Sequence, residues 1–383
     1  MDNFTFQNPT KLVFGKGEVK QLSTLIPKDK KIMITYGGGS IKKNGVYDSV
    51  INALKGYNIT EFGGIPANPE YEILKEAINK CKAEKIDFVL AVGGGSVIDG
   101  TKFIVAGAKY EGDAWDFISG KATVKDALDF ATVLTLPATG SEMNCGAVIS
   151  RRETKEKYAF SSTHCFPLFS VLDPENIYSL PQRQITNGIV DTFIHTMEQY
   201  LTFDNKTYLM DRFAEGILST LINIAPDLTS GKKDYQTYAN FMICATMGLN
   251  NFISMGVVQD WATHMIGHEI TALCGLDHGQ TLAIVFPGTM DIMRKEKKDK
   301  LLMYAKNVWH IDTTDPNNAI DLVIEKTEDF FKSIGMKIRL SDYDIKKDVI
   351  NTIVSRFEQR HWNVGENGIV TPNKVRLILE RVY

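Results

Sequence analysis

The stretch "DFVLAVGGGSVIDGTKFIVAGA" at residues 87–108 decides the fold of the first half of this chain. Residues 87–92 form the apolar run of a buried strand, and the glycines that follow stop this run before a helical pattern begins. A turn without side chains lets backbone N–H groups approach phosphate oxygens, and the N-terminus of the next helix adds free donors and a positive dipole end. The stretch therefore predicts a strand, a phosphate-binding turn and a helix.

This glycine turn differs from the two best-known phosphate-binding motifs. Ile98 stands where GxGxxG, counted from Gly93, requires its third glycine, and no GxxxxGK[ST] motif is present. The sequence therefore argues against a nucleoside triphosphatase. Taken alone, the turn is also compatible with a glycine-rich connection that binds no ligand.

A second glycine turn, "YGGGSIKKNG" at 36–45, favours a dinucleotide. Across the carboxyl ends of parallel strands, one turn can hold the pyrophosphate and another the adenosine ribose. NAD-selective sites usually place an acid against the ribose hydroxyls, whereas this strand ends in glycines and Ser40, with Lys42 and Lys43 close behind. The absence of an acid predicts NADP(H) in preference to NAD(H). The alternative is that both lysines are ordinary exposed residues.

Strands and helices alternate over the first half of the chain. Apolar, β-rich runs lie at 30–36, 57–64, 87–92 and 132–138, and helical periodicity separates them, as at 69–85. This alternation predicts a mainly parallel, doubly wound sheet.

The pattern changes around "VLDPENIYSLPQRQITNG" (171–188), after which long helical periodicities replace the strands. We predict an α/β N-terminal dinucleotide-binding domain with a parallel sheet over residues 1–184. An all-α C-terminal metal-binding domain is predicted over residues 185–383.

Composition excludes several classes of protein. The net charge of −3 provides no basic surface for nucleic acid. No apolar stretch approaches the roughly 20 residues that span a bilayer, and residues 1–11 do not have the pattern of a signal peptide. The five cysteines are scattered and form no CxxC pair, which is typical of reduced thiols. We expect a cytoplasmic globular protein with neither a nucleic-acid nor a membrane partner.

Three of the seven histidines lie in "DWATHMIGHEITALCGLDHGQ" (260–280). His264 and His268 are four residues apart and share a helix face, and His278 follows Gly275, where we expect the helix to end. A fourth histidine, His195, is paired in the same way with Asp191. One carboxylate with three of these four imidazoles suits Fe²⁺ or Zn²⁺, and the spacing does not decide which three bind.

Two other interpretations of the histidines fit the sequence less well. Met265 follows His264, so the HExxH motif of metalloproteases is absent. Any one of these histidines, taken alone, is more often a satisfied core imidazole than a metal ligand. Their grouping with Asp191 favours the metal site.

Four motifs together resemble the iron-containing (group III) alcohol dehydrogenase family, from about residue 8 to residue 376. They are "GGGSVIDGTKF" (93–103), "TLPATGSEMN" (135–144), "DTFIHTMEQY" (191–200) and "DWATHMIGHEITALCGLDHGQTLAIVFP" (260–287). Within the family the chain is similar to the NADPH-dependent short-chain aldehyde reductases, often called butanol dehydrogenases.

The resemblance implies roles for particular residues. The implied metal ligands are Asp191, His195, His264 and His278, and His268 lines the site without being required as a ligand. The proton for the product could come through water, a ribose hydroxyl or His268, which we take as the candidate catalytic residue because it is the titratable side chain of the motif left free for that role. The implied cofactor-binding residues are Gly38, Gly39, Ser40, Asn68, Gly94, Gly95, Ser96, Asp99, Thr135, Thr139 and Lys157.

The function that follows is a metal-dependent, NAD(P)H-linked alcohol dehydrogenase or aldehyde reductase. It would interconvert small-molecule short-chain aldehydes and primary alcohols, such as butanal and butanol, with one Fe²⁺ or Zn²⁺ and NADP(H) as cofactors. A homodimer or larger homo-oligomer is implied by the resemblance alone.

Two rival functions have testable differences. A dehydroquinate-synthase-like lyase that uses metal and NAD must bind a polyanionic sugar acid, and "HMIGHEITALCGL" supplies few cations for that purpose. Such a lyase regenerates its cofactor, whereas a reductase consumes it. A metal or nucleotide sensor would oxidise no NADPH with any aldehyde.

Overall fold

The computed structural model of the protein describes residues 1–383, which form two compact units. The sheet unit comprises Gln7–Pro181 and Lys233–Thr246, and the helical unit comprises Met1–Phe6, Gln182–Lys232 and Met247–Tyr383. The chain therefore changes from one unit to the other near residue 182, and residues 233–246 return to the sheet unit. The prediction of domains at 1–184 and 185–383 did not include this return.

A six-stranded sheet forms the centre of the sheet unit, in the order β1-β8-β5-β4-β2-β3. All its strand pairs are parallel, which confirms the predicted α/β class. The strands are β1 (Lys11–Phe14), β2 (Lys31–Thr35), β3 (Asn58–Phe62), β4 (Phe88–Gly94), β5 (Asp129–Leu136) and β8 (Phe169–Leu172). The sequence pattern missed β1 and β8, because runs of four residues are too short to show a period.

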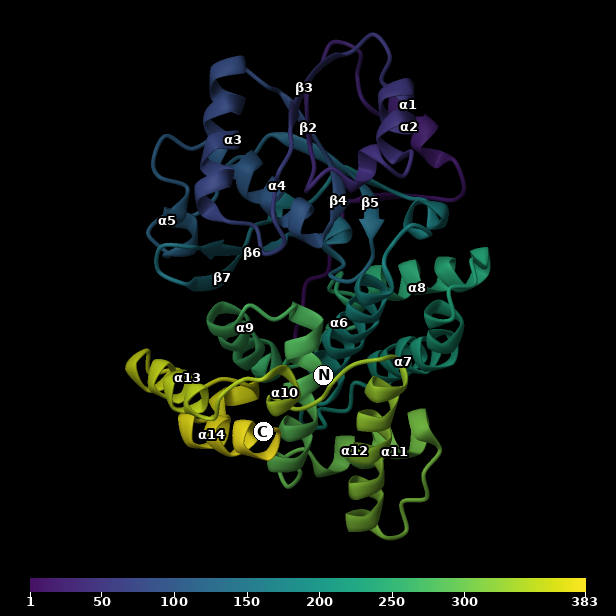
Figure 1. Ribbon diagram of the computed structural model, residues 1–383, viewed down its shortest axis with the longest axis vertical. Coiled ribbons are helices and arrows are strands. Elements are labelled where there is room, and N and C mark those ends of the chain that lie inside the picture. Colours follow the sequence, from purple (N-terminus) through teal and green to yellow (C-terminus); the bar gives the residue numbers. More distant parts are fainter. The chain divides into compact units, whose positions relative to one another are not determined.

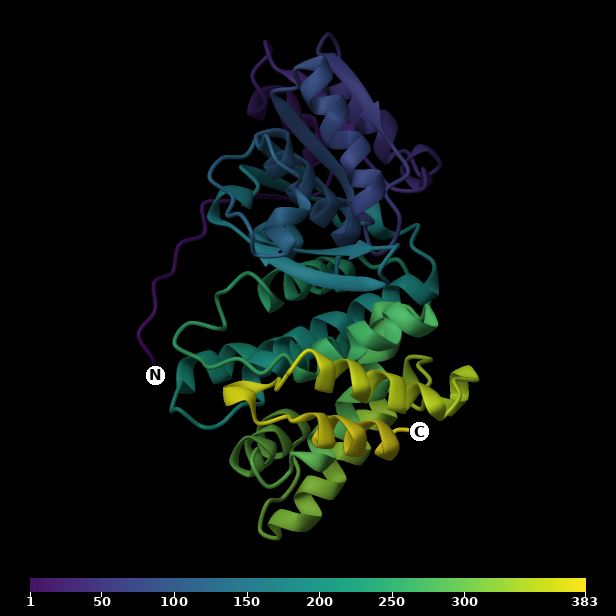
Figure 2. The ribbon, with the colours of Figure 1, turned by 90° about the vertical axis from the view of Figure 1, so that its left-hand side faces the viewer.

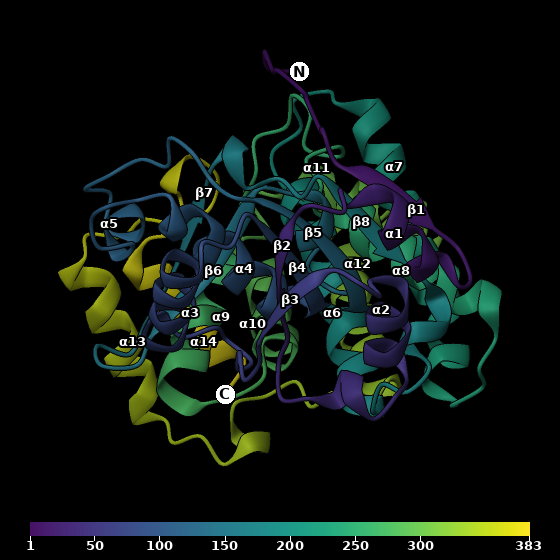
Figure 3. The ribbon, with the colours of Figure 1, turned by 90° about the horizontal axis from the view of Figure 1, so that it is seen from above.

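Helices cover both faces of this sheet (Figure 3). Helices α1 (Leu22–Leu25) and α2 (Val46–Ala53) cover one face, and α3 (Tyr71–Glu84) and α4 (Gly95–Ala108) the other. Strand residues alternate between the faces: Ile32 joins a buried cluster that contains Leu22 and Val50, whereas the Met33 sulfur lies 3.6 Å from that of Cys81 on α3. The sheet is therefore doubly wound, as predicted.

Two further parts of the sheet unit were not predicted. An antiparallel hairpin joins β6 (Gly146–Arg151) to β7 (Glu156–Ser161) (Figure 2). Most of α8 (Tyr235–Gly248) also belongs to this unit, where the Thr246 hydroxyl donates to Glu142 Oε1 at 2.5 Å. The short α5 (Trp115–Ile118) completes the unit.

The helical unit is built from long helices, and all the named strands lie in the other unit, which confirms an all-α fold here (Figure 1). Its helices are α6 (Gln182–Tyr200), α7 (Tyr208–Thr229), α9 (Ala262–Cys274), α10 (His278–Ile292), α11 (Lys298–Trp309), α12 (Pro316–Ser333), α13 (Asp348–Gln359) and α14 (Pro372–Arg381). Helices α9, α10, α13 and α14 share one buried cluster that includes Ile266, Ile284, Phe357 and Ile378. None of the helices has both the length and the apolar character needed to cross a membrane.

Candidate functional site

Helix α6 supplies the first two side chains of a candidate metal centre. Asp191 and His195 are one turn apart, so they project from the same face of the helix. Both are buried, and so is nearly every residue from Ile185 to Tyr200. A carboxylate and an imidazole held this deep need partners, because water cannot solvate them there.

Helices α9 and α10 supply the histidines that face α6. Gly275, with φ 72°, ends α9, and Asp277 begins α10 with a capping box that it forms with Gln280. The Asp277 carboxylate also accepts a hydrogen bond from Asn187 Nδ2 at 2.7 Å, which ties the start of α10 to α6. Gly279 permits this approach, because a Cβ there would lie 2.8 Å from the Asn187 backbone.

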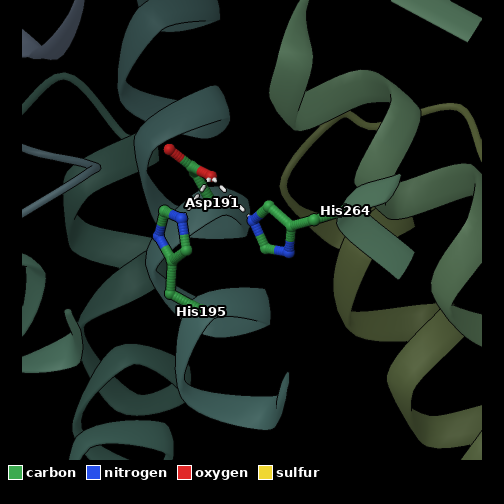
Figure 4. Close-up of side chains that lie close together, drawn as sticks. All are labelled: Asp191, His195 and His264. Carbon is green, nitrogen blue, oxygen red and sulfur yellow. Dashed lines mark ion pairs between the residues drawn. The ribbon is translucent and has the colours of Figure 1, made fainter. Parts of the chain in front are cut away.

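Three imidazole nitrogens converge on one carboxylate oxygen. Figure 4 shows two of the three, those of His195 and His264, beside the Asp191 carboxylate. Asp191 Oδ1 lies 3.6 Å from His195 Nε2, 3.8 Å from His264 Nε2 and 3.6 Å from His278 Nε2. The potential ligand atoms of Asp191, His195 and His264 all lie within 4.8 Å of one another. Ligands bonded to a single zinc ion at about 2.0–2.2 Å stand about 3–3.6 Å apart, so one divalent cation fits among these atoms.

The hydrogen bonding of the His264 ring supports a cation at this position. Its Nε2 is buried and has no hydrogen-bond partner, which is rare for a buried polar atom in a protein that lacks a ligand at that point. Its Nδ1 lies 3.3 Å from Glu198 Oε1, and its backbone N–H donates to the same oxygen at 3.0 Å. Glu198 thus orients the His264 ring so that its Nε2 faces Asp191, as carboxylates do for metal-binding histidines.

The site attracts positive charge. Burial by itself lowers the pKa of His264, but the nearby carboxylates of Asp191 and Glu198 outweigh burial and raise the pKa above its usual value. The field that favours a proton on this imidazole also favours a divalent cation.

His268 lies beside this group. Its ring centroid is 5.1 Å from that of His278 and 6.3 Å from that of His264. The structure therefore brings the sequence-predicted histidines together, with three around Asp191 Oδ1 and the fourth against the His278 ring.

In the sheet unit, the first glycine turn forms where β4 ends at Gly94 and α4 begins at Gly95. A Cβ at Gly95 would lie 2.5 Å from the Thr139 side chain, and a Cβ at Gly94 would lie 2.8 Å from Leu136 Cβ. The end of β5, which includes the buried Thr135, and the segment after it therefore pack directly on the turn. Ser96 is the second residue of α4.

Asp99 and Lys102 connect α4 to residues 141–148. The Asp99 carboxylate accepts from Ser141 Oγ at 2.6 Å and from the Val148 N–H at 2.9 Å. Lys102 is completely buried, and its ammonium donates to Ser141 Oγ, Asn144 Oδ1 and the Gly146 carbonyl at 2.7–2.8 Å. Burial lowers the pKa of Lys102 to about 8. Sequence reasoning missed Lys102, although a lysine within the apolar run "TKFIVAGA" was a signal.

At the second glycine turn, Gly38 and Gly39 have open space where a side chain would stand, and Gly39 has φ 89°. The expectation that no acid lies near this turn is wrong. Glu61, close to the end of β3, accepts hydrogen bonds from Tyr36 and Lys42, which flank the turn. The pairing of β3 with β2 brings it there, and the sequence alone does not show which strands are neighbours.

Two of the predicted cofactor residues contact one another. Lys157 on β7 donates from Nζ to Asn68 Oδ1 at 2.8 Å. Asn68 has a positive φ of 58°, a conformation that asparagine tolerates better than most residues.

Comparisons with known proteins agree with these features. A family model described as "Iron-containing alcohol dehydrogenase" matches residues 9–174, and one described as "Fe-containing alcohol dehydrogenase family, C-terminal" matches residues 185–383. The chain is 48% identical to the NADPH-dependent aldehyde reductase YqhD of Escherichia coli over 99% of each chain. It is 44% identical to a probable NADH-dependent butanol dehydrogenase 1 of Bacillus subtilis over 93% of each. A crystal structure of NADH-dependent butanol dehydrogenase A from Thermotoga maritima superposes with a TM-score of 0.96 and 36% identity, covering 100% of this chain and 99% of that one.

Proposed function

Because the chain belongs to the iron-containing alcohol dehydrogenase family, we propose that its main reaction is the NADPH-dependent reduction of short unbranched aldehydes to primary alcohols. The broader activity follows from the family and its near relatives: the protein is an NAD(P)-linked alcohol and aldehyde oxidoreductase. The convergence of three imidazole nitrogens on Asp191 Oδ1 is the observation that carries the proposal. The lyase alternative is not favoured, because these relatives are named as reductases and dehydrogenases.

Asp191, His195, His264 and His278 would hold one divalent cation, Fe²⁺ or Zn²⁺. When bound, such a cation would supply a positive charge that stabilises negative charge on a carbonyl oxygen, and the nicotinamide would supply the hydride. A single carboxylate with three neutral imidazoles leaves a divalent centre with net positive charge. The burial of Asp191, His195 and His264 keeps the ligand atoms away from bulk water.

The glycine turns would hold the dinucleotide. Gly94, Gly95 and Ser96 suit the pyrophosphate, because they form the junction between β4 and the N-terminus of α4. Gly38, Gly39 and Ser40 suit the adenosine ribose, since the open space at both glycines leaves room for a ligand. Asn68, Asp99, Thr135, Thr139 and Lys157 are proposed as further contacts. The Lys42 ammonium lies next to this turn, where it could contact a 2′-phosphate, which supports NADPH over NADH.

Assembly as a homodimer or larger homo-oligomer and a cytoplasmic location remain predictions.

His268 would pass a proton to the product alkoxide, because its ring lies against that of His278 and its usual pKa is near neutrality. We expect His268→Ala to retain the metal and to lose about a hundredfold in kcat. Metal content by mass spectrometry and steady-state kinetics on the same preparation check this prediction. Loss of metal from this variant would make His268 a ligand and overturn the assignment.

Metal dependence tests the proposed function as a whole. We expect chelator-treated protein to lose NADPH oxidation with butanal and to regain it when Fe²⁺ or Zn²⁺ is added, with kcat/KM higher for NADPH than for NADH. Nicotinamide absorbance follows both reactions. Full activity without metal would contradict the metal centre. An equal or higher kcat/KM for NADH would contradict the NADP preference alone, and no turnover under any condition would favour a sensor.

A further inference from the structure

A cluster of four polar side chains borders the turn proposed to hold the adenosine ribose. Tyr36 follows β2, Lys42 ends the short 3₁₀ helix after the turn, Tyr47 lies on α2 and Glu61 lies on β3. Hydrogen bonds from the backbone of Tyr36 to Phe62, and from Gly64 to Gly37, hold the end of β3 against the turn. The cluster, here called the Glu61 cluster, therefore lies next to residues 37–40.

Glu61 is the acceptor at the centre of the cluster. Its Oε2 accepts from the Tyr36 hydroxyl at 2.9 Å and from Lys42 Nζ at 2.8 Å, and its Oε1 accepts from the Tyr47 hydroxyl. The Lys42 ammonium also lies 4.8 Å from the centroid of the Tyr36 ring and 4.6 Å from that of Tyr47. Gly63 leaves space for this arrangement, because a Cβ there would lie 2.4 Å from the Tyr36 ring. One carboxylate and two aromatic rings thus hold the cation in a defined place.

Stability does not explain the cluster. The Lys42 and Glu61 side chains are 42% and 32% exposed, and an ion pair this exposed contributes little to folding because water screens it. Burial by itself raises the pKa of Glu61, but the hydrogen bonds from Lys42 and the two tyrosines outweigh burial and lower the pKa. Glu61 is consequently ionised at neutral pH and neutralises the charge of Lys42.

We propose that Glu61 limits the preference of this turn for a 2′-phosphate by neutralising Lys42. The inference rests on the proposed function, which places the adenosine ribose of NAD(P)H at Gly38–Ser40. The 2′-phosphate of NADPH must share the Lys42 ammonium with Glu61 and must also approach a negative charge. NADH carries no phosphate at the 2′ position, so the charges of Lys42 and Glu61 have little effect on its binding. Glu61 is therefore a specificity-determining residue that lets both cofactors bind.

The variant Glu61→Gln tests the proposal, because it removes the charge and keeps the shape. We expect the dissociation constant for NADPH to fall about fivefold to tenfold and that for NADH to stay within about twofold. Lys42→Met should weaken NADPH binding by about tenfold, and Glu61→Gln should have a smaller effect when Lys42 is already methionine. Fluorescence titration with NADPH and with NADH measures both constants without metal or aldehyde. Glu76→Gln, an exposed glutamate on α3, removes the same charge elsewhere in the sheet unit and is the control.

Two results would overturn the proposal. Weaker NADH binding by Glu61→Gln would mean that the carboxylate receives the ribose hydroxyls directly, and unchanged binding of both cofactors would mean that the cluster has no part in selection. Thermal melts of each variant identify a folding defect, and the exposed Lys42 provides a second variant that tests the same charge. If the unaltered protein binds neither cofactor, the proposed function itself fails, which is distinct from a failure of this inference.

Discussion

His264→Ala is expected to lose the bound metal and the aldehyde reductase activity together. The substitution removes the imidazole whose Nε2 lies 3.8 Å from Asp191 Oδ1, and it leaves Glu198 buried without its ring partner. Loss of an outer partner of a metal ligand typically costs 10–100-fold in affinity or activity, so we expect removal of the ligand itself to cost more than about a hundredfold. Zinc titration by calorimetry and kcat/KM with butanal measure the two effects.

His164→Ala is the matched control for this variant. His164 is exposed and belongs to the sheet unit, so its loss should change neither metal content nor rate. A metal-free His264→Ala protein with full activity would show that the histidine group serves another purpose. Retention of stoichiometric metal by the variant would equally contradict the proposed ligand set.

Lys297→Met is expected to destabilise the protein by about 3–5 kcal/mol, the usual cost of removing one partner from a buried ion pair. Lys297 is 1% exposed, and its ammonium donates to Asp260 Oδ2 at 2.7 Å, to Glu366 Oε2 at 2.6 Å and to the Leu201 carbonyl at 2.8 Å. Burial already raises the pKa of Glu366 to about 8, even with Lys297 present. Methionine would leave two buried carboxyl groups without their cation.

The free energy of unfolding from urea titration measures this loss, with the exposed Lys298→Met as the control. Metal affinity should fall in the same variant, because Asp260 fixes the start of α9. Its Oδ1 accepts from the Ala262 N–H at 2.8 Å, and its own N–H donates to the Glu198 carbonyl at 2.9 Å. A change of less than about 0.5 kcal/mol, typical of surface substitutions, would show that the network does not depend on this ammonium.

Local patterns in the sequence predicted a large part of the molecule correctly. The apolar run at 87–92 and the glycines after it became β4 and the start of α4, and the helical periodicities after residue 182 became an all-α unit. The i, i+4 spacing of Asp191 and His195 placed both on one face of α6, as expected. Such features follow from backbone hydrogen bonds between residues close in sequence, so the period of the side chains reveals them.

Other features depended on contacts between residues far apart in the chain. The position of His278 near Asp191 required Gly279 to pack on Asn187, and the position of Glu61 beside the second glycine turn required β3 to pair with β2. The burial of Lys102 and Lys297 likewise depends on partners from about 40 to about 100 residues away. The sequence by itself therefore determined the long helices, the central strands of the sheet and the residue types for metal and dinucleotide chemistry. Only the tertiary structure decided which charges meet, because the strand order and helix packing that bring them together arise from many weak contacts summed over the whole chain.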